Sequence, residues 1–162
     1  MIKVQHEDFD TGQELAALTD GRTDIGGVAS FIGLVREMAD DRQLSAMTLE
    51  HYPGMTEKML GEVEAEARKR WPLDDCLIIH RYGRLEPGER IVMVAAASAH
   101  RKAALEACAF LIDWLKTKAP FWKLEESGDD DPAGGQWVRS KSSDDDAAAR
   151  WSADPDDKNQ GS

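Results

Sequence analysis

The sequence has no long apolar run, few cysteines and no excess of positive charge, and each absence excludes a class of protein. No apolar stretch approaches about 18 residues, so no transmembrane helix is expected, and the first residues lack the apolar core of a signal peptide. Cys76 and Cys108 form no CxxC pair, and a chain of this length folds without disulfides, so a cytoplasmic location is expected. Phosphate loops, dinucleotide fingerprints, zinc motifs and the serine-hydrolase elbow are also missing.

The net charge of -11 is unevenly distributed along the chain. From Glu125 onward there are 11 acidic and 4 basic residues, a net of -7, which leaves -4 for the rest. An acidic chain without a basic stripe is not expected to bind nucleic acid, although net charge does not exclude one local cationic pocket. We expect residues 1–140 to form one domain and residues 141–162 to form a mostly disordered acidic tail, in which Trp151 docks on the body.

Hydrophobic periodicity predicts alternating strands and helices. An amphipathic helix is expected over 56–71, and a longer one over 101–118, with Ser98 as its cap and Leu105, Cys108, Leu111, Ile112 and Leu115 as its buried stripe. A short helix is expected over 11–18, with Asp10 as its N-cap. Strands are expected over 2–6, 28–35, 44–52, 76–82 and 90–97, the last central in a sheet, and residues 38–43 are expected to be an exposed loop.

The order of these elements predicts an α/β (α+β) fold in which helices pack on one sheet. Two short strands, Phe121–Leu124 and Gln136–Val138, are expected to pair as a hairpin around a turn rich in Gly and Asp. The two cysteines lie in apolar runs and are interpreted as buried core thiols. His6 and His80 lie in strands without a partner at metal-ligand spacing, so both are interpreted as structural and no metal site is expected.

Several cations lie beside apolar, structured segments. His100 and Arg101 stand where the longest helix begins, so they lie near free backbone N–H groups that suit an anion such as phosphate; solvent exposure or a local cap is an alternative. Arg36 closes the strand that begins at Val28. Arg139 follows a short strand and is a further candidate for binding an anion.

Two lysines bracket a proline break that is followed by two aromatic residues. Lys116 is expected in the last turn of the long helix, and Lys123 follows Pro120-Phe-Trp122. Lysines that are partly withdrawn from water can act as nucleophiles or as acids and bases. The alternative is that Lys116 only complements the negative end of the helix dipole.

Five blocks of sequence together resemble the large, catalytic subunit of molybdopterin synthase. They occur in the order of that family and cover roughly Val28 to Val138. The blocks are Phe31-Ile-Gly-Leu-Val-Arg36, Thr48-Leu-Glu-His-Tyr-Pro-Gly-Met-Thr-Glu-Lys58, His80-Arg-Tyr-Gly-Arg-Leu-Glu-Pro-Gly88, Ser98-Ala-His-Arg101 and Asp113-Trp-Leu-Lys-Thr-Lys-Ala-Pro-Phe-Trp-Lys123.

The resemblance implies an α/β hammerhead-type fold with an additional small antiparallel β sub-domain. It also implies a sulfurtransferase without a cofactor that works as a homodimer within a heterotetramer. The partner would be a small ubiquitin-like sulfur carrier whose C-terminal thiocarboxylate enters the site. The substrate would be cyclic pyranopterin monophosphate, which receives two sulfurs to form the dithiolene of molybdopterin.

The resemblance also assigns roles to residues. Lys116 and Lys123 match the two essential lysines and are expected to be catalytic and substrate-binding. Arg36, His100 and Arg101 match substrate-binding positions, and the last two are expected to reach into the neighbour's site. Arg139 matches a further basic residue near the pocket.

Two features depart from the family pattern, and two other functions remain open. Leu34 stands where some relatives carry a basic residue, and the tail beyond Ser152 extends past the usual family end. One alternative is a non-catalytic dimeric module that binds a ubiquitin-like partner or a phosphorylated ligand. The other is a hydrolase with paired carboxylates such as Glu50, for which no second acid is evident.

Overall fold

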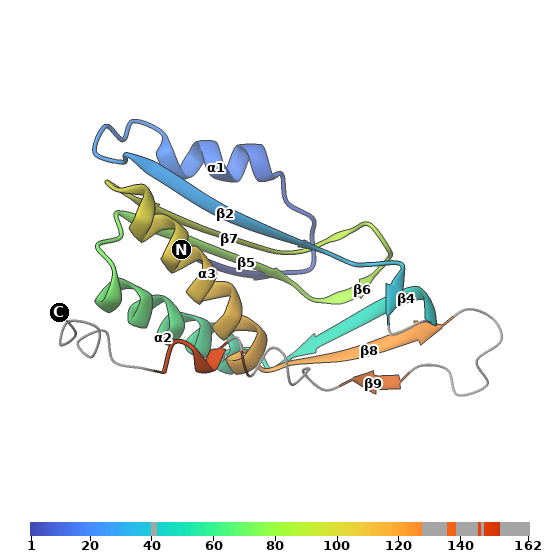
Figure 1. The fold of residues 1–162 in the computed structure, drawn as a ribbon. Helices are drawn as coiled ribbons and strands as arrows, with labels where there is room; N and C mark the ends of the chain where they lie inside the picture. The colour runs from blue at the N-terminus through green and yellow to red at the C-terminus, as the bar shows by residue number, and fades with distance from the viewer. Residues whose placement is uncertain (40–41, 128–135, 139–145, 147, 153–162) are drawn as a thin grey trace.

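The computed structural model describes residues 1–39, 42–127, 136–138, 146 and 148–152 (Figure 1). The mixed α/β fold expected from the sequence is confirmed. The described elements are β1 (Ile2–Gln5), α1 (Thr11–Thr19), β2 (Gly27–Leu34), β3 (Met38–Ala39), β4 (Arg42–His51), α2 (Met55–Arg70), β5 (Asp75–Arg81), β6 (Gly83–Leu85), β7 (Arg90–Ser98), α3 (Arg101–Lys118), β8 (Phe121–Ser127) and β9 (Gln136–Val138).

The main layer is a four-stranded sheet in the order β1-β5-β7-β2, as far as the described residues show. Strand β1 pairs with β5 in parallel, and the other two pairings are antiparallel. Helices α2 and α3 cover one face of the sheet and α1 covers the other, so β5 and β7 are buried on both sides (Figure 1). Two-sided burial explains why both strands are almost continuously apolar in the sequence.

Alternate residues of the buried strands serve different cores. Ile78 and Val94 face α2 and α3, where they pack with Leu60, Phe110 and Leu111. Their strand neighbours Ile79 and Met93 face α1 and pack with Phe9 and Leu18. The predicted central position of the 90–97 strand is confirmed, since β7 lies between β5 and β2. Asp10 caps α1 as expected, because its carboxylate accepts the Gln13 N–H at 2.8 Å.

A second, antiparallel sheet extends from one end of the main sheet (Figure 1). Its order is β3-β4-β8-β9, and β6 pairs with the edge of β4 opposite to β8. The predicted hairpin is confirmed, because β8 and β9 pair with Leu124 opposite Trp137. Side chains from this sheet and from the end of β2 enclose a small core of their own, made of Val35, Met47, Leu49 and Leu85.

Three expectations about local structure were wrong, and one strand was missed. Residues 38–43 are not a plain loop, because Met38–Ala39 pairs with the start of β4. Strand β6 was not expected at all; backbone pairing with β4 creates it. Leu105 is 60% exposed, because the small residues Ala103, Ala104 and Ala107 form the closest packing surface of α3 there. Ser98 does not cap α3: His100 occupies that position, and the Ser98 hydroxyl donates to the Pro72 carbonyl at 2.8 Å.

The expected docking of Trp151 is confirmed. Its indole ring packs edge-on against Trp71 and Phe110, with ring centroids 5.6 Å away in both cases. Its N–H donates to the Asp113 carboxylate at 2.8 Å, and Arg70 donates to its backbone carbonyl at 2.6 Å. This segment therefore closes the hydrophobic core between α2 and α3. Residues 153–162 of the predicted tail lie outside the described residues.

None of the helices in the described part of the chain combines the length and the apolar character that crossing a bilayer requires.

Candidate functional site at the junction of α3 and β8

The two predicted lysines lie on either side of a tight junction between α3 and β8. Lys116 is exposed in the last turn of the helix, and Lys123 is the third residue of the strand. The Ala119 N–H donates to the Leu115 carbonyl at 3.2 Å and ends the helix. The Phe121 N–H then donates to the Ala119 carbonyl at 2.9 Å, so the chain reverses within a few residues. The helix and the proline turn therefore bring the two amines to one end of the molecule.

The side chain of Lys123 is held by a carboxylate that the sequence interpretation did not single out. Its amine forms an ion pair with Glu125, whose side chain is only 6% exposed. Residues two apart on a strand share one face, and on β4 this face carries Leu49 opposite Lys123 and Met47 opposite Glu125. Both of these apolar residues are buried. The Lys-x-Glu spacing was the available signal for this pair, although the predicted strand ended at Leu124, one residue before Glu125.

A stacked pair of rings anchors the start of β8. The Phe121 ring lies on the His80 ring with centroids 3.7 Å apart and an interplanar angle of 16°. Burial lowers the pKa of His80 to about 4, so the ring is neutral near pH 7. Its Nδ1 lies 2.8 Å from the Arg81 carbonyl, which requires that nitrogen to carry the proton. The structural role expected for His80 is thereby confirmed.

Arg36 lies on the border of the same small core as Lys123. It is exposed and follows Val35, which is buried together with Leu49. Leu49 is the residue opposite Lys123 in the β4–β8 pairing. The Val35 N–H donates to the Glu89 carbonyl at 2.9 Å, and the Val35 carbonyl accepts from the Gly88 N–H at 2.8 Å. The end of β2 is therefore fixed by the turn that precedes β7.

His100 and Arg101 lie at the opposite end of α3. Lys116 follows Arg101 by 15 residues, which corresponds to roughly 22 Å along a helix axis. Gly26 allows the entry of β2 to pass against the start of this helix, because a Cβ there would lie 2.1 Å from the Ala99 carbonyl oxygen. Within one chain, the structure does not bring His100 and Arg101 to the lysines.

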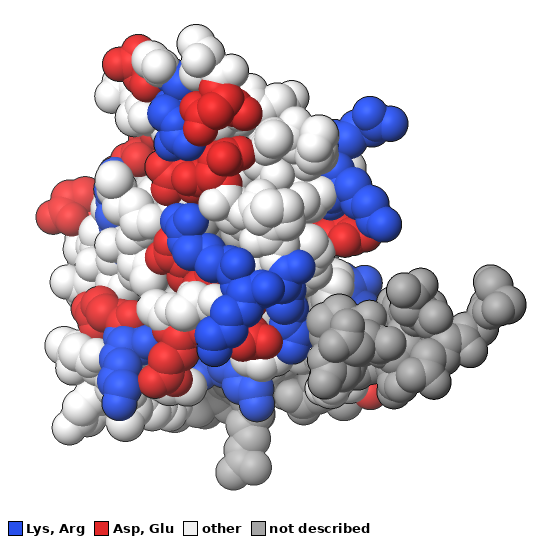
Figure 2. Space-filling model, turned by 90° about the vertical axis from the view of Figure 1, so that its left-hand side faces the viewer, with Lys and Arg blue, Asp and Glu red and all other residues white. Residues whose placement is uncertain are grey.

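The surface around the start of α3 carries both signs of charge (Figure 2). The basic residues in the last turn of α2 are neutralised locally: Arg68 pairs with Glu64, and Arg70 pairs with Glu66. Arg101 is exposed and makes no ion pair within the described residues. Its guanidinium is thus available to an anion or to another chain.

The remaining predicted residues do not add to the site. Arg139 lies outside the described residues. Cys76 and Cys108 are buried free thiols, as expected, and burial raises their pKa to about 12 and about 11, so neither is a reactive thiolate. Among the described residues, no group of three or more His, Cys, Asp or Glu side chains has the arrangement of a metal site.

Comparison with known proteins identifies relatives along most of the chain. The family model described as MoaE protein matches residues 4–118. A molybdopterin synthase catalytic subunit of Pseudomonas aeruginosa is 55% identical over 150 residues, which cover 93% of this chain and 97% of the relative. One of the same name from Escherichia coli is 48% identical over 150 residues, with the same coverage of both chains.

Solved structures agree with this family. A molybdopterin biosynthesis MoaE protein from Burkholderia ambifaria superposes with a TM-score of 0.80 at 48% identity, covering 95% of this chain and 99% of that one. A molybdopterin synthase structure from Staphylococcus aureus superposes with a TM-score of 0.76 at 30% identity, covering 85% of this chain and 96% of that one. Sequence and fold together establish that the chain belongs to the MoaE protein family.

Proposed function

We propose that this protein is the catalytic subunit of a molybdopterin synthase. It transfers sulfur from the C-terminal thiocarboxylate of a small ubiquitin-like carrier to cyclic pyranopterin monophosphate. The observation that carries this proposal is the placement of Lys116 and Lys123 on either side of the α3–β8 junction, within a chain of the MoaE family. Free buried thiols also favour a reducing, cytoplasmic location.

The chemistry needs positive charge rather than a protein thiol. The thiocarboxylate sulfur of each carrier replaces an oxygen substituent of the pterin, which leaves with a proton, and water then cleaves the acyl–sulfur bond. The carrier is left as a carboxylate, so the nucleophilic sulfur comes from the carrier. A lysine amine beside the thiocarboxylate stabilises negative charge that develops on its carbonyl oxygen, or transfers a proton. Lys116 suits this role because it is exposed at the end of a rigid helix. Glu125 holds the amine of Lys123 in one direction.

Arg36 supplies the charge that a phosphate-bearing substrate requires. It follows Val35, a residue of the small core that also contains Leu49, the residue opposite Lys123. Arginine binds phosphate through two parallel hydrogen bonds, which orients the ligand as well as holding it. We assign Arg36 to binding the phosphate of the pterin, and Lys116 and Lys123 to the atoms between which sulfur is transferred.

His100 and Arg101 are proposed to act on the site of a second copy of this chain. Strand β2 is an edge strand, and its exposed apolar side chains favour a covered interface. If two β2 edges pair antiparallel over their full length about a two-fold axis, Gly27 of one chain lies opposite Leu34 of the other. Gly27 lies beside Arg101, and Leu34 is two residues before Arg36. One chain would thereby complete the site of its partner.

The experiment is a reconstitution with purified components. Wild-type protein, thiocarboxylated carrier and cyclic pterin are mixed, and dithiolene product is measured. We expect product with the wild type and none with Lys116→Ala, although that variant still binds the carrier. A carrier complex that forms no product in the wild type would instead support a non-catalytic binding module. Unchanged turnover of Lys116→Ala would refute the role of that lysine.

A further inference from the structure

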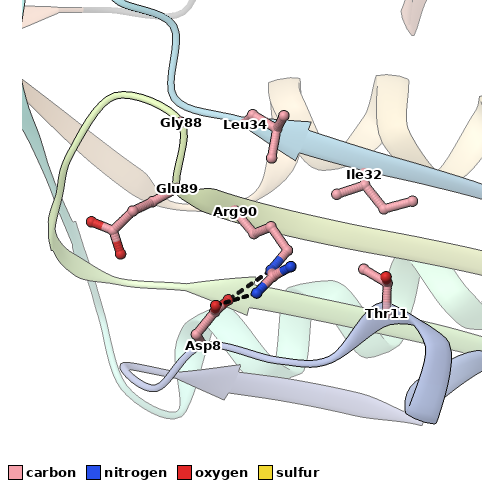
Figure 3. A pocket seen from close by; sticks show the side chains of 7 residues that line it. All are labelled: Asp8, Thr11, Ile32, Leu34, Gly88, Glu89 and Arg90. Atoms are coloured by element: carbon pink, nitrogen blue, oxygen red, sulfur yellow. Dashed lines mark hydrogen bonds and ion pairs between the residues drawn. The ribbon is translucent and has the colours of Figure 1, made fainter.

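The backbone that carries Arg36 is held by a turn rather than by its own strand. Val35 lies just beyond β2, and both of its backbone groups bond to residues 88 and 89 at the lengths given above. Figure 3 shows Gly88 and Glu89 in this turn beside Leu34, at the end of β2. Because Arg36 is the next residue, the position of its Cα follows the position of the turn.

The carboxylate of Glu89 closes the turn from inside. It accepts the Glu86 N–H at 2.6 Å, across the turn, and it accepts from the Arg81 guanidinium at 3.2 Å. The Glu86 N–H and the Arg81 guanidinium together lower the pKa of Glu89, so this acceptor is ionised near pH 7. Gly88 has φ 89°, a left-handed conformation that a side chain would oppose. The Glu89 N–H also donates to the Glu86 carbonyl at 3.0 Å, so the turn is closed both by the backbone and by this carboxylate.

Arg81 connects that carboxylate to the main sheet. Its side chain is only 7% exposed. It donates to the backbone carbonyls of His6 at 3.1 Å and of Arg90 at 3.0 Å, two segments that the sheet already positions. The guanidinium is thus fixed independently of the turn. Its Nη1 lies 3.7 Å from the Asp8 carboxylate and 3.2 Å from that of Glu89, and the second contact ties the turn to the sheet. The Asp8 carboxylate, which pairs with Arg90 (Figure 3), also neighbours the Arg81 guanidinium, so Asp8 and Glu89 share this cation.

We propose that Glu89 is a positioning residue for the sulfur-transfer reaction. Together with Arg81, it holds the turn that presents Arg36 to the phosphate of the substrate. This proposal rests on the substrate-binding role proposed for Arg36 above. Glu89 does not touch the substrate; it acts through the two backbone hydrogen bonds to Val35.

A matched pair of variants in the same turn tests the proposal. In Glu89→Ala the turn loses the carboxylate that accepts hydrogen bonds inside it. We expect the KM for the pterin to rise about tenfold, because the arrangement of the turn that binds substrate would fall to about a tenth of the population. The kcat at saturating pterin and the affinity for the carrier stay unchanged. Glu86→Ala is the control, because that carboxylate is 66% exposed and pairs with Arg84 at the surface, so its KM should equal that of the wild type. Glu89→Gln keeps an acceptor oxygen and should partly restore the KM.

A double-mutant cycle separates the positioning role from the role of Arg36 itself. If Glu89 acts through Arg36, then Arg36→Ala combined with Glu89→Ala has the same KM as Arg36→Ala alone. Additive effects of the two substitutions on the KM would overturn the proposal. It would also be overturned if Glu89→Ala had the same KM as the control Glu86→Ala while Arg36→Ala raised the KM. A fall in kcat and thermal stability with no change in KM would likewise reduce Glu89 to a structural residue. If Arg36→Ala itself leaves the KM unchanged, the substrate-binding role of Arg36 fails first.

Discussion

The buried histidine under the α3–β8 junction predicts a defined loss of stability in mild acid. His80 is 6% exposed, and burial lowers its pKa from 6.5 to about 4. In the unfolded chain the imidazole takes up a proton as the pH falls through 6.5, whereas the folded protein takes none until about pH 4. The unfolded state therefore binds more protons in this window, and the stability of the fold decreases as the pH falls.

The size of the effect follows from the two pKa values. Between pH 7 and pH 5, the free energy of unfolding should fall by about 2 kcal/mol through this one group. The carboxyl groups whose pKa is lowered, such as those of Asp8 and Glu89, titrate in the unfolded chain near 4 to 4.5, and so they contribute mainly below pH 5. The interval from pH 7 to pH 5 thus excludes most of the carboxyl contribution, and comparison with variants at position 80 separates His80 from the other three histidines.

Urea denaturation at several pH values measures this dependence. In His80→Phe the ring stack with Phe121 can persist, but position 80 no longer titrates. His80→Gln has no ring and does not titrate, but it keeps a donor to the Arg81 carbonyl. Both variants should lose about 2 kcal/mol less than the wild type between pH 7 and pH 5. A wild-type profile as flat as that of both variants would refute the reasoning.

Two further predictions concern stability at a single pH. Trp151→Ala removes a half-buried ring from the core between α2 and α3. It should lower the free energy of unfolding by about 2 kcal/mol, which is below the range for fully buried aromatic residues. Trp122→Ala is the control, because that side chain is 49% exposed and its loss should change the unfolding midpoint little. Lys116→Ala should unfold at the same denaturant concentration as the wild type, because the side chain is exposed. A large loss of stability in this variant would mean that its loss of activity results from misfolding.

Local patterns were sufficient for most of the fold. The bounds of α3 were predicted to the residue, because Pro120 and the apolar periodicity mark its length. Strands β5 and β7 were recognisable because burial on both faces makes them continuously apolar. Pairing with a distant strand creates β6, and no local signal in Gly83–Leu85 announces it. Leu105 was misplaced because periodicity gives the phase of a helix but not the width of its packed face.

The candidate site was predictable only in part, for a similar reason. Lys116, Lys123 and Arg36 were found because they stand in family blocks beside breaks in regular structure. Glu89 and Arg81 were not found, because their roles arise from contacts between the ends of β1, β2, β5 and β7. Glu125 carried a signal in its spacing from Lys123, but its burial depends on the packing of β4 beside β8.

The central claim is that each sulfur-transfer site is completed by two chains, and mixing two inactive variants tests it most directly. In a heterodimer of Lys116→Ala with Arg101→Ala, one of the two sites keeps both residues if Arg101 acts across the interface. Random mixing in equal amounts should therefore restore about a quarter of the wild-type activity. Mixing Lys116→Ala with Lys123→Ala is the control and should restore none, since both lysines belong to one chain's site. No recovery in the first mixture, with exchange of subunits demonstrated, would contradict the shared site.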